Sequence, residues 1–227
     1  MTPDQQRSPG VQATAPDDPA EVAKAPQGLS GDFRRAVFKA AACLLGYPDD
    51  AFWQLLPAVV AYFRDLQDMQ PAAALVTAAA AMGEWPRLAL AALYVATFDF
   101  GEPTALYLTA HELGDSRRRG SALLALRSML RAAGFEPTDT ELPDYLPLLF
   151  EFLASAPEDC ETSELERRLA VVCLQIHSKL ADGHPYRGVF TALLGILPNE
   201  ERTSPQPPFP LREEADTGEL PYPLRYD

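Results

Sequence analysis

The stretch DFRRAVFKAAACLLG, residues 32–46, carries its apolar side chains at the spacing of an α-helix. The residues that fall on one face are Phe33, Val37, Ala40, Ala41 and Leu44. Gly46 follows the last of them and is typical of a helix end. A helix with one apolar face has to pack that face against another element, so the stretch predicts one helix of a larger helical domain.

The same helical period continues through the middle of the chain. Further helices are predicted at residues 49–66, 71–82, 86–98, 104–112, 116–133, 142–156, 163–183 and 185–197. No stretch alternates polar and apolar residues with the β-branched content that strands favour. The predicted fold class is therefore all-α, a single helical bundle of about eight or nine helices with short connections.

Local signals predict where several of these helices begin, bend or end. Pro57 lies inside a predicted helix and should kink or split it, because proline lacks the backbone N–H. Asp115 is predicted to cap the helix that follows it. Ser163 and Glu166 have the spacing of a capping box at the start of another helix. Gly134 is the predicted C-terminal stop of the helix before it.

The two ends of the chain differ from the middle in composition. Residues 1–30 carry five prolines and almost no large apolar side chain, and residues 198–227 carry seven prolines and seven acidic residues. Neither end has enough apolar surface to offset the entropy of ordering, so both are predicted to be disordered. Residues 31–197 are the predicted folded domain.

The charge and cysteine content bound the kind of partner and the compartment. The net charge of −13 argues against a nucleic-acid partner and favours a cationic one. The three cysteines, Cys43, Cys160 and Cys173, have no C-x-x-C spacing, which indicates reduced thiols in the cytoplasm. The start of the chain lacks the pattern of a secretory signal, and no apolar run reaches the roughly 20 residues that span a bilayer. A cytoplasmic protein without stable membrane insertion is expected.

No motif indicates a reaction centre. The histidines His111, His177 and His184 do not have the spacing of a zinc site, and no metal is expected. Neither a G-x-S-x-G nucleophile motif nor a phosphate-binding glycine loop is present. The sequence therefore predicts a protein without catalytic residues.

Residues 111–120, HELGDSRRRG, place arginines at the start of a predicted helix, where the helix dipole disfavours cations. Two interpretations stay open: nearby acids compensate the charges, or Arg117 and Arg119 tie the preceding loop to another segment by charge-assisted hydrogen bonds. A partly buried His111 that donates to the backbone is expected. Gly114 should permit a tight turn, and Gly120 a close helix contact.

Residues 138–153, TDTELPDYLPLLFEFL, place carboxylates before another predicted helix. Glu141 and Asp144 have the position of helix-capping acids, which meet unpaired backbone N–H groups. The alternative is that these acids line a groove and receive a basic peptide.

Together the two stretches resemble the NarJ-type nitrate reductase molybdenum cofactor assembly chaperones, a branch of the TorD/DmsD family of redox-enzyme maturation chaperones. The motifs that carry the resemblance are G-D-S-R-x-R-G at 114–120 and E-L-P-D-x-L-P at 141–147, with Phe98-Asp99, Leu106, Leu108, His111, Ala122 and Glu151. The resemblance covers residues 33–156 well, and 163–197 only by helical pattern.

The resemblance implies a non-catalytic cytoplasmic chaperone. It would bind the N-terminal basic segment of the apo catalytic (molybdenum) subunit of nitrate reductase, and hold it until the molybdenum cofactor is inserted and the complex assembles at the membrane. No cofactor would be bound permanently, and a homodimer stays open. An acidic helical groove suits a basic amphipathic segment.

The resemblance and the charges together also suggest peptide-binding residues. Asp99, Glu141 and Asp144 would receive positive charge from the peptide. The residues expected to shape the groove are His111, Gly114, Asp115, Arg117, Arg119 and Gly120. Pro143 and Tyr145 complete the second motif, and Tyr145 takes a position where related chaperones often have histidine.

Three alternatives remain beside this hypothesis. The client could be another molybdenum oxidoreductase. The chain could be a small helical enzyme in which His111 and Asp115 perform acid–base catalysis. It could also be a regulatory interaction module that acts through its terminal segments.

Overall fold

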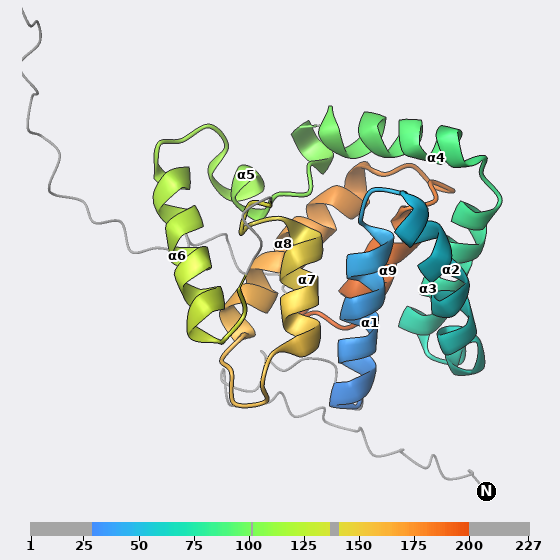
Figure 1. Cartoon of the computed structure of the whole chain (residues 1–227), viewed down its shortest axis with the longest axis horizontal. Helices are drawn as coiled ribbons and strands as arrows, with labels where there is room; N and C mark the ends of the chain where they lie inside the picture. Colours follow the sequence, from blue (N-terminus) through green and yellow to red (C-terminus); the bar gives the residue numbers. More distant parts are fainter. Residues whose placement is uncertain (1–28, 101, 137–140, 200–227) are drawn as a thin grey trace, which may run out of the picture.

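A computed structural model of the chain describes residues 29–100, 102–136 and 141–199, and these residues form an all-helical domain (Figure 1). The α-helices are α1 (Gly31–Leu44), α2 (Asp50–Phe63), α3 (Gln70–Gly83), α4 (Arg87–Tyr94), α5 (Leu108–Leu113), α6 (Arg118–Ala132), α7 (Leu146–Ser155), α8 (Ser163–Lys179) and α9 (Arg187–Leu194). A π-helix, η3 (Val95–Asp99), continues α4, and 3₁₀ turns lie at η2 (Arg64–Leu66) and η4 (Glu102–Thr104). The predicted all-α fold with eight or nine helices is confirmed for this part of the chain.

Helix α1 lies at the centre of the domain. It packs against α7 on one side and against α9 on the other, while α3 packs between α9 and α2. Figure 1 shows α1 and α7 side by side, with α2 and α3 at one end of the domain and α6 at the opposite end. The predicted apolar face of the first helix is buried along its whole length, from Phe33 to Leu44. Because this apolar face has to be covered, the neighbouring helices pack around α1.

Capping side chains set the starts of the first two helices. The Ser30 hydroxyl accepts a hydrogen bond from the Phe33 N–H (3.2 Å), and the Asp49 carboxylate accepts one from the Phe52 N–H (2.9 Å). Each bond satisfies a backbone donor that has no partner inside its helix. Gly134 follows α6 with φ = 78°, a left-handed conformation that favours glycine, and this confirms it as the predicted stop.

Two predictions of helix caps are wrong, and a third prediction holds at most in part. Helix α2 runs through Pro57 as one helix, so the exposed proline does not split it. Asp115 does not cap α6; the Ser116 hydroxyl accepts a hydrogen bond from the Arg118 N–H (3.3 Å) instead.

The predicted capping box of α8 is also displaced. Ser163 is the first residue of the helix, and the capping position belongs to Thr162. The Thr162 hydroxyl donates to the Glu166 carboxylate (3.0 Å). The predicted capping box is therefore wrong: Glu166 pairs with the Thr162 hydroxyl, and Thr162 caps no backbone N–H.

Two predicted helices are shorter than expected for a tertiary reason. The segment predicted at 104–112 becomes helical as α5 only at Leu108, and the segment predicted at 142–156 becomes helical as α7 only at Leu146. The residues in between form an extended contact with each other, which includes an isolated antiparallel bridge between Tyr107 and Tyr145. Within the described ranges this bridge is the only strand-like pairing.

The predicted tails, 1–30 and 198–227, lie outside the described residues except at their inner ends, where Ser30 caps α1. No helix in the described part of the chain is long and apolar enough to cross a bilayer.

Two glycines differ in what surrounds them. A Cβ built at Gly120 has no atom within 4 Å, so the predicted close helix contact at this residue is wrong. The close contact lies at Gly188 in α9, where a Cβ would stand 2.9 Å from the Ala74 carbonyl oxygen and 3.0 Å from the Ala78 Cβ. Backbone of α3 therefore passes α9 at a distance that only glycine allows.

This difference predicts opposite effects of the same substitution. Gly188→Ala should lower the free energy of unfolding by about 1–3 kcal/mol through overpacking against α3. Gly120→Ala should raise it by up to about 1 kcal/mol, because alanine favours the helix and meets no neighbour. Urea denaturation of both variants beside the wild type measures the two effects, and equal midpoints would contradict the packing described here.

Candidate functional site

The two sequence motifs that carry the family resemblance meet in the structure. Residues 106–108 lie antiparallel to residues 144–146, with the Leu108 N–H donating to the Asp144 carbonyl (2.9 Å) and the Leu146 N–H donating to the Leu106 carbonyl (2.9 Å). Between these two bonds the rings of Tyr107 and Tyr145 stand with their centroids 5.6 Å apart. Each tyrosine directly precedes a helix, α5 or α7, so the pairing sets where both helices begin.

The Asp144 side chain fastens this contact from inside. Its Oδ2 accepts hydrogen bonds from the Thr109 N–H (3.2 Å) and from the Thr109 hydroxyl. The Arg119 Nε donates to the same hydroxyl (3.1 Å), and its Nη2 lies 3.6 Å from Asp144 Oδ2. We call Asp144, Thr109 and Arg119 the Asp144 latch. It joins the loop before α7 to the first turns of α5 and α6.

The Asp144 latch changes the interpretation of the predicted acids. Asp144 is 0% exposed and its charge is matched by Arg119 of the same chain. It does not lie on a surface where a peptide could reach it, contrary to the expectation from sequence, because its carboxylate is directed at Thr109. The prediction that Arg119 ties the loop to another segment is confirmed. Arg117 is exposed and, in the described part of the chain, has no ion pair.

The remaining residues of the first motif form a turn. The His111 Nε2–H donates to the Ala105 carbonyl (2.7 Å), so the expected backbone contact of this histidine is confirmed. Gly114 has φ = 53°, which favours glycine and ends α5. Asp115 is exposed beyond that turn. Among the described residues, His111 and Asp115 form no hydrogen bond with each other, so the structure does not assemble the acid–base pair of the enzyme alternative.

Helix α5 has a second attachment that the sequence analysis did not predict. Arg168 of α8 donates from Nε and Nη2 to the two carboxylate oxygens of Glu112, each at 2.7 Å. Both side chains are largely buried, with exposed fractions of 12% and 13%. A bidentate pair of this kind also fixes the orientation of the two groups. Glu112 therefore pairs with Arg168 of α8 and not with the arginines that follow it in the sequence.

Tyr145 is anchored by a tyrosine of α4. Its hydroxyl lies 3.0 Å from that of Tyr94, which donates in turn to the Leu45 carbonyl (3.1 Å). Because a phenol has one proton and Tyr94 donates it to Leu45, Tyr145 is the donor in the pair. Burial raises the pKa of Tyr145 to about 12, so the phenol stays neutral and keeps this bond at physiological pH.

Two exposed acids act electrostatically on the paired tyrosines. They are Asp99, the last residue of η3, and Glu141. Burial raises the pKa of Tyr107, and the charges of Glu141, Asp144 and Asp99 raise it further. Burial also raises the pKa of Tyr145, and the charges of Glu141 and Asp99 contribute. We call Asp99, Tyr107, Glu141 and Tyr145 the acidic tyrosine surface. Pro143 is buried beneath it.

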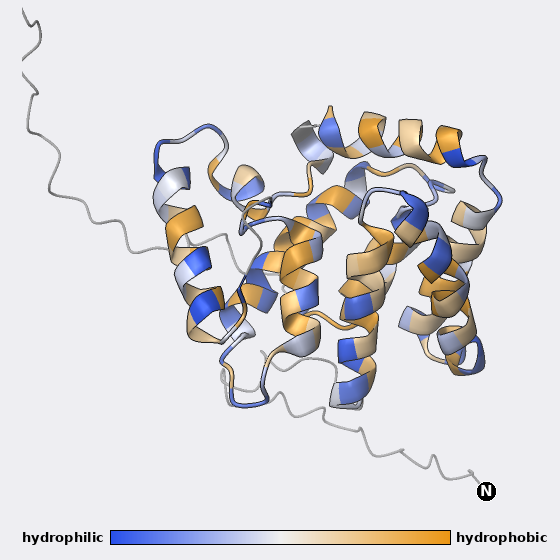
Figure 2. Ribbon diagram, in the orientation of Figure 1, coloured by the Kyte–Doolittle hydropathy of each residue, from blue (hydrophilic) through white to orange (hydrophobic). Residues whose placement is uncertain are grey.

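An apolar stripe leads from this surface along α4. Leu88 is 84% exposed and Phe100 is 83% exposed, and Ala92 and Ala96 are exposed between them. These residues follow each other at helical spacing, and Asp99 lies at the end of the stripe next to Phe100. Figure 2 shows hydrophobic residues along α4 at the outer edge of the domain. Exposed apolar side chains in a row are typical of a binding surface.

The π-helix that carries Asp99 is held by a histidine. His184 Nδ1 accepts from the Tyr186 N–H (3.4 Å), and its Nε2 lies 3.3 Å from the Thr97 hydroxyl. Because Nδ1 accepts, the neutral ring carries its proton on Nε2 and donates to Thr97. Thr97 donates to the Leu93 carbonyl (2.7 Å), one turn earlier. A π-helical turn is frequent at functional sites, and this one sets the position of Asp99.

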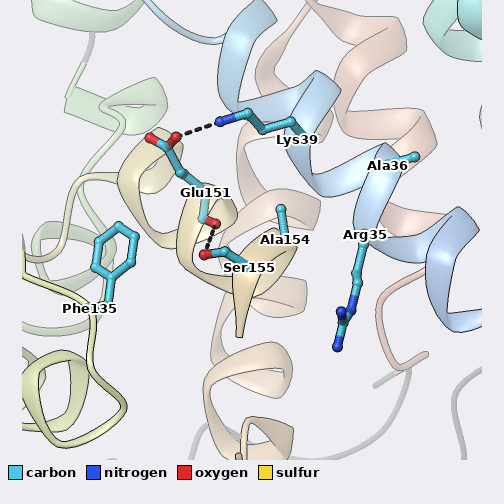
Figure 3. Close-up of a pocket in the computed structure, with 7 residues that line it drawn as sticks. All are labelled: Arg35, Ala36, Lys39, Phe135, Glu151, Ala154 and Ser155. Carbon is cyan, nitrogen blue, oxygen red and sulfur yellow. Dashed lines mark hydrogen bonds and ion pairs between the residues drawn. The ribbon is translucent and has the colours of Figure 1, made fainter. Parts of the chain in front are cut away.

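A pocket of about 430 Å³ lies elsewhere, between α1, α7 and the chain after α6 (Figure 3). The Lys39 ammonium and the Glu151 carboxylate meet across it at 2.5 Å, and Arg35 donates to the Ala156 carbonyl (3.1 Å). None of the predicted site residues lines it. Lys39 and Glu151 neutralise each other there, whereas the partner of Arg35 is a neutral carbonyl. Over the described ranges, no cluster of three or more His, Cys, Asp or Glu side chains has the arrangement of a metal site.

Sequence reasoning missed the exposed stripe residues Leu88 and Phe100. It also missed four residues around the two motifs: Tyr94, Tyr107, Thr109 and Arg168. One signal was available for Tyr107, because LYL at 106–108 and DYL at 144–146 place a tyrosine before a leucine that opens a helix in both motifs. The other three lie on other helices and act through contacts that no spacing rule predicts.

Comparisons with known proteins identify the class of protein. The structure resembles that of a redox enzyme maturation protein from Archaeoglobus fulgidus, with a TM-score of 0.54 and 20% identity, over 74% of this chain and 93% of that chain. This likeness shows a shared all-helical fold.

The family follows from sequence. The profile of the nitrate reductase delta subunit family matches residues 65–190, which include both motifs. The chain is 36% identical over 167 residues to the protein named probable nitrate reductase molybdenum cofactor assembly chaperone NarJ of Bacillus subtilis, over 73% of this chain and 90% of that protein. It is 30% identical over 174 residues to the NarJ assembly chaperone of Escherichia coli K12, over 69% of this chain and 66% of that protein. The chain belongs to the nitrate reductase delta subunit family, as a NarJ-type member, and the predicted resemblance is confirmed.

The Asp144 latch predicts unequal roles for two acids of one motif. Asp144→Ala should lower the free energy of unfolding by about 3 kcal/mol, because the Thr109 N–H and the Arg119 guanidinium lose their buried acceptor. Glu141→Ala, at an exposed position, should change it by less than about 0.5 kcal/mol. Urea denaturation compares the two variants, and a comparable loss in both would contradict the burial of Asp144.

The His184 contact predicts a dependence of stability on pH. Burial lowers the pKa of His184 below its ordinary value near 6.5, so the unfolded chain takes up this proton more readily than the folded one. Stability should therefore fall as the pH decreases below about 6.5. His184→Gln keeps an N–H donor for Thr97 without a titrating group, so its melting temperature should fall less between about pH 7.5 and pH 5.5. If the melting temperatures of the wild type and of His184→Gln fall equally with decreasing pH, His184 is not the titrating group.

Proposed function

We propose that this protein is an assembly chaperone for a molybdenum-containing nitrate reductase. It binds the N-terminal basic segment of the apo catalytic subunit in the cytoplasm, and keeps that subunit competent for insertion of the molybdenum cofactor and for assembly at the membrane. The cofactor belongs to the client, and the chaperone performs no bond chemistry. Support comes from the family to which the chain belongs and from the naming of its relatives as assembly chaperones.

One observation in the structure carries the proposal: exposed Asp99 lies at the end of the apolar stripe of α4, and its charge and that of exposed Glu141 both act on Tyr107. A basic amphipathic helix has a matching arrangement, with an apolar face and cations at its edge. In this arrangement its apolar side chains cover Leu88 and Phe100, and its basic side chains reach Asp99 and Glu141. The net charge of the whole chain, −13, adds a longer-range attraction for the basic segment.

The two parts of the surface contribute differently to binding. Burial of large apolar side chains such as Leu88 and Phe100 supplies about 1.5–3 kcal/mol each and sets how long the complex lasts. Exposed carboxylates are solvated and screened, so they supply little affinity and act on the rate of encounter. The Asp144 latch takes part by fixing where Tyr107 and Tyr145 stand, without contact to the peptide.

The client could also be another molybdenum oxidoreductase, because the surface recognises only that the segment is basic and amphipathic. The nitrate reductase client is favoured by the family match over residues 65–190, which spans the acidic tyrosine surface.

Charge reversal on the acidic tyrosine surface tests the proposal. The double variant Asp99→Lys and Glu141→Lys should bind a synthetic leader peptide of the client about tenfold more slowly at low salt, and the difference should shrink near 1 M salt, where the Debye length is about 3 Å. Asp68→Lys is the matched control, since Asp68 is exposed before α3 and outside this surface. Stopped-flow fluorescence measures the association rate.

Two further results complete this test. Leu88→Ser with Phe100→Ser should raise the dissociation rate and leave the association rate within about twofold, because apolar contacts form after encounter. The apo client without its N-terminal segment should no longer be recovered with the chaperone. Equal recovery of the full and truncated client would reject the proposal.

A further inference from the structure

Helix α6 differs in charge from the rest of the chain. Residues 117–133 contain five arginines and no acidic residue, in a chain whose net charge is −13. Three of the arginines, Arg117 to Arg119, stand at the N-terminal end of the helix, and its first turn contains no acid. Cations at this end oppose the helix dipole, which costs about 0.3–1 kcal/mol each. Stability of the helix therefore does not explain Arg117, Arg118 and Arg119, whereas Arg131, in the last turn, is favoured by the dipole.

Only one of the five arginines has a structural role in the described part of the chain. Arg119 faces inward and belongs to the Asp144 latch. Arg117, Arg118 and Arg131 are exposed and Arg127 is half-buried, and within the described residues none of these four forms an ion pair. Four positive charges are thus presented outward from one helix.

The outward face of α6 also has the shape of a helix-docking surface. Ser121, Leu124 and Ser128 are exposed along its middle, and Leu124 is 68% exposed. Gly120 and the serines are small, and a Cβ at Gly120 would meet nothing, so another backbone can approach closely. Arginines stand at both ends of this face, about 21 Å apart from Arg117 to Arg131 at 1.5 Å per residue.

This face is distinct from the apolar stripe of α4, although the first turn of α6 reaches the acidic tyrosine surface through Arg119 and Asp144. Figure 1 places α6 at one end of the domain, whereas α4 lies along its top and reaches toward α2 and α3. The two surfaces also have opposite charge. A basic leader segment would be repelled by Arg127 and Arg131, so it is not the occupant of this face.

We propose that the outer face of α6, formed by Arg117, Leu124, Arg127 and Arg131, docks an acidic amphipathic helix of a partner protein. The leucine of α6 packs against an apolar residue at the middle of that helix. Carboxylates about two turns to either side of it pair with Arg117 at one end and with Arg127 and Arg131 at the other.

Other anionic partners fit this face less well. A nucleic acid would meet a protein of net charge −13 through only four free arginines, far from the basic footprint that phosphate backbones require. A membrane surface needs an apolar face that enters the acyl region, and Leu124 is the only large apolar side chain exposed on α6. A helix of a protein can place an apolar side chain on Leu124 and charged ones around it, which is the arrangement of an apolar centre with a polar rim.

A synthetic acidic peptide of about 20 residues tests the proposal, since shorter peptides are marginal helices. The peptide carries a central leucine and glutamates at both ends, and a second peptide carries lysines in their place. In fluorescence anisotropy the full chain should bind the acidic peptide, whereas the basic one has only the leader-segment surface available, so charge reversal on α6 should leave its affinity unchanged. Arg127→Glu with Arg131→Glu should weaken binding at least tenfold, and Arg64→Glu, an exposed arginine of η2, should change it less than twofold.

Several results would overturn the proposal. Equal affinity of the wild type and the double variant for the acidic peptide would do so. Binding of phosphatidylglycerol vesicles or duplex DNA without binding of the peptide would do so as well. If the wild type is a dimer in sedimentation and the double variant a monomer, the occupant is a second copy. Circular dichroism checks that the variant is folded, and unchanged affinity for the leader peptide separates this proposal from the proposed chaperone function.

Discussion

The buried carboxylate of Asp144 joins the two family motifs of this domain. Asp144 accepts hydrogen bonds from both the backbone and the hydroxyl of Thr109, and Arg119 closes the group from α6. Because the three residues come from three different segments, the loop before α7 cannot move without breaking contacts to α5 and α6. The bridge between Tyr107 and Tyr145, and with it the orientation of both rings, depends on this attachment. A buried charge with matched partners is unfavourable to break, which makes it suited to fix one arrangement of loops.

The charges of the domain are sorted by location. Two exposed acids are available to a partner: Asp99, at the end of η3 and of the exposed apolar stripe, and Glu141, before α7. Some ion pairs that join helices, such as Glu112 with Arg168, are largely buried, whereas others, such as Lys39 with Glu151, are exposed. Helix α6 holds the opposite arrangement, a basic outer face on an acidic body. A chain organised in this way can attract a cationic segment at one end and an anionic one at the other, because screening limits each field to about 10 Å.

Local sequence signals performed well where the structure depends on neighbouring residues. The apolar face from Phe33 to Leu44, the stop at Gly134 and the turn at Gly114 follow from spacing and from backbone conformations that favour glycine. Local signals failed where the environment of a residue depends on a partner that is distant in the sequence. Gly120 meets nothing while Gly188 touches α3, and two helices begin late because their first residues pair with each other. In the second motif, the spacing predicted the same role for Asp144 and Glu141, although Asp144 is buried and Glu141 is exposed.

The sequence by itself determined the all-helical class, the positions of most helices and the membership in the family, because helical periodicity and short motifs are written in consecutive residues. Only the tertiary structure decided which acids are available to a partner. Whether a carboxylate faces solvent or an arginine depends on segments that are far apart in the chain, as with Asp144 and Thr109, which lie 35 residues apart. Burial is a property of the assembled helices, and no local pattern contains it.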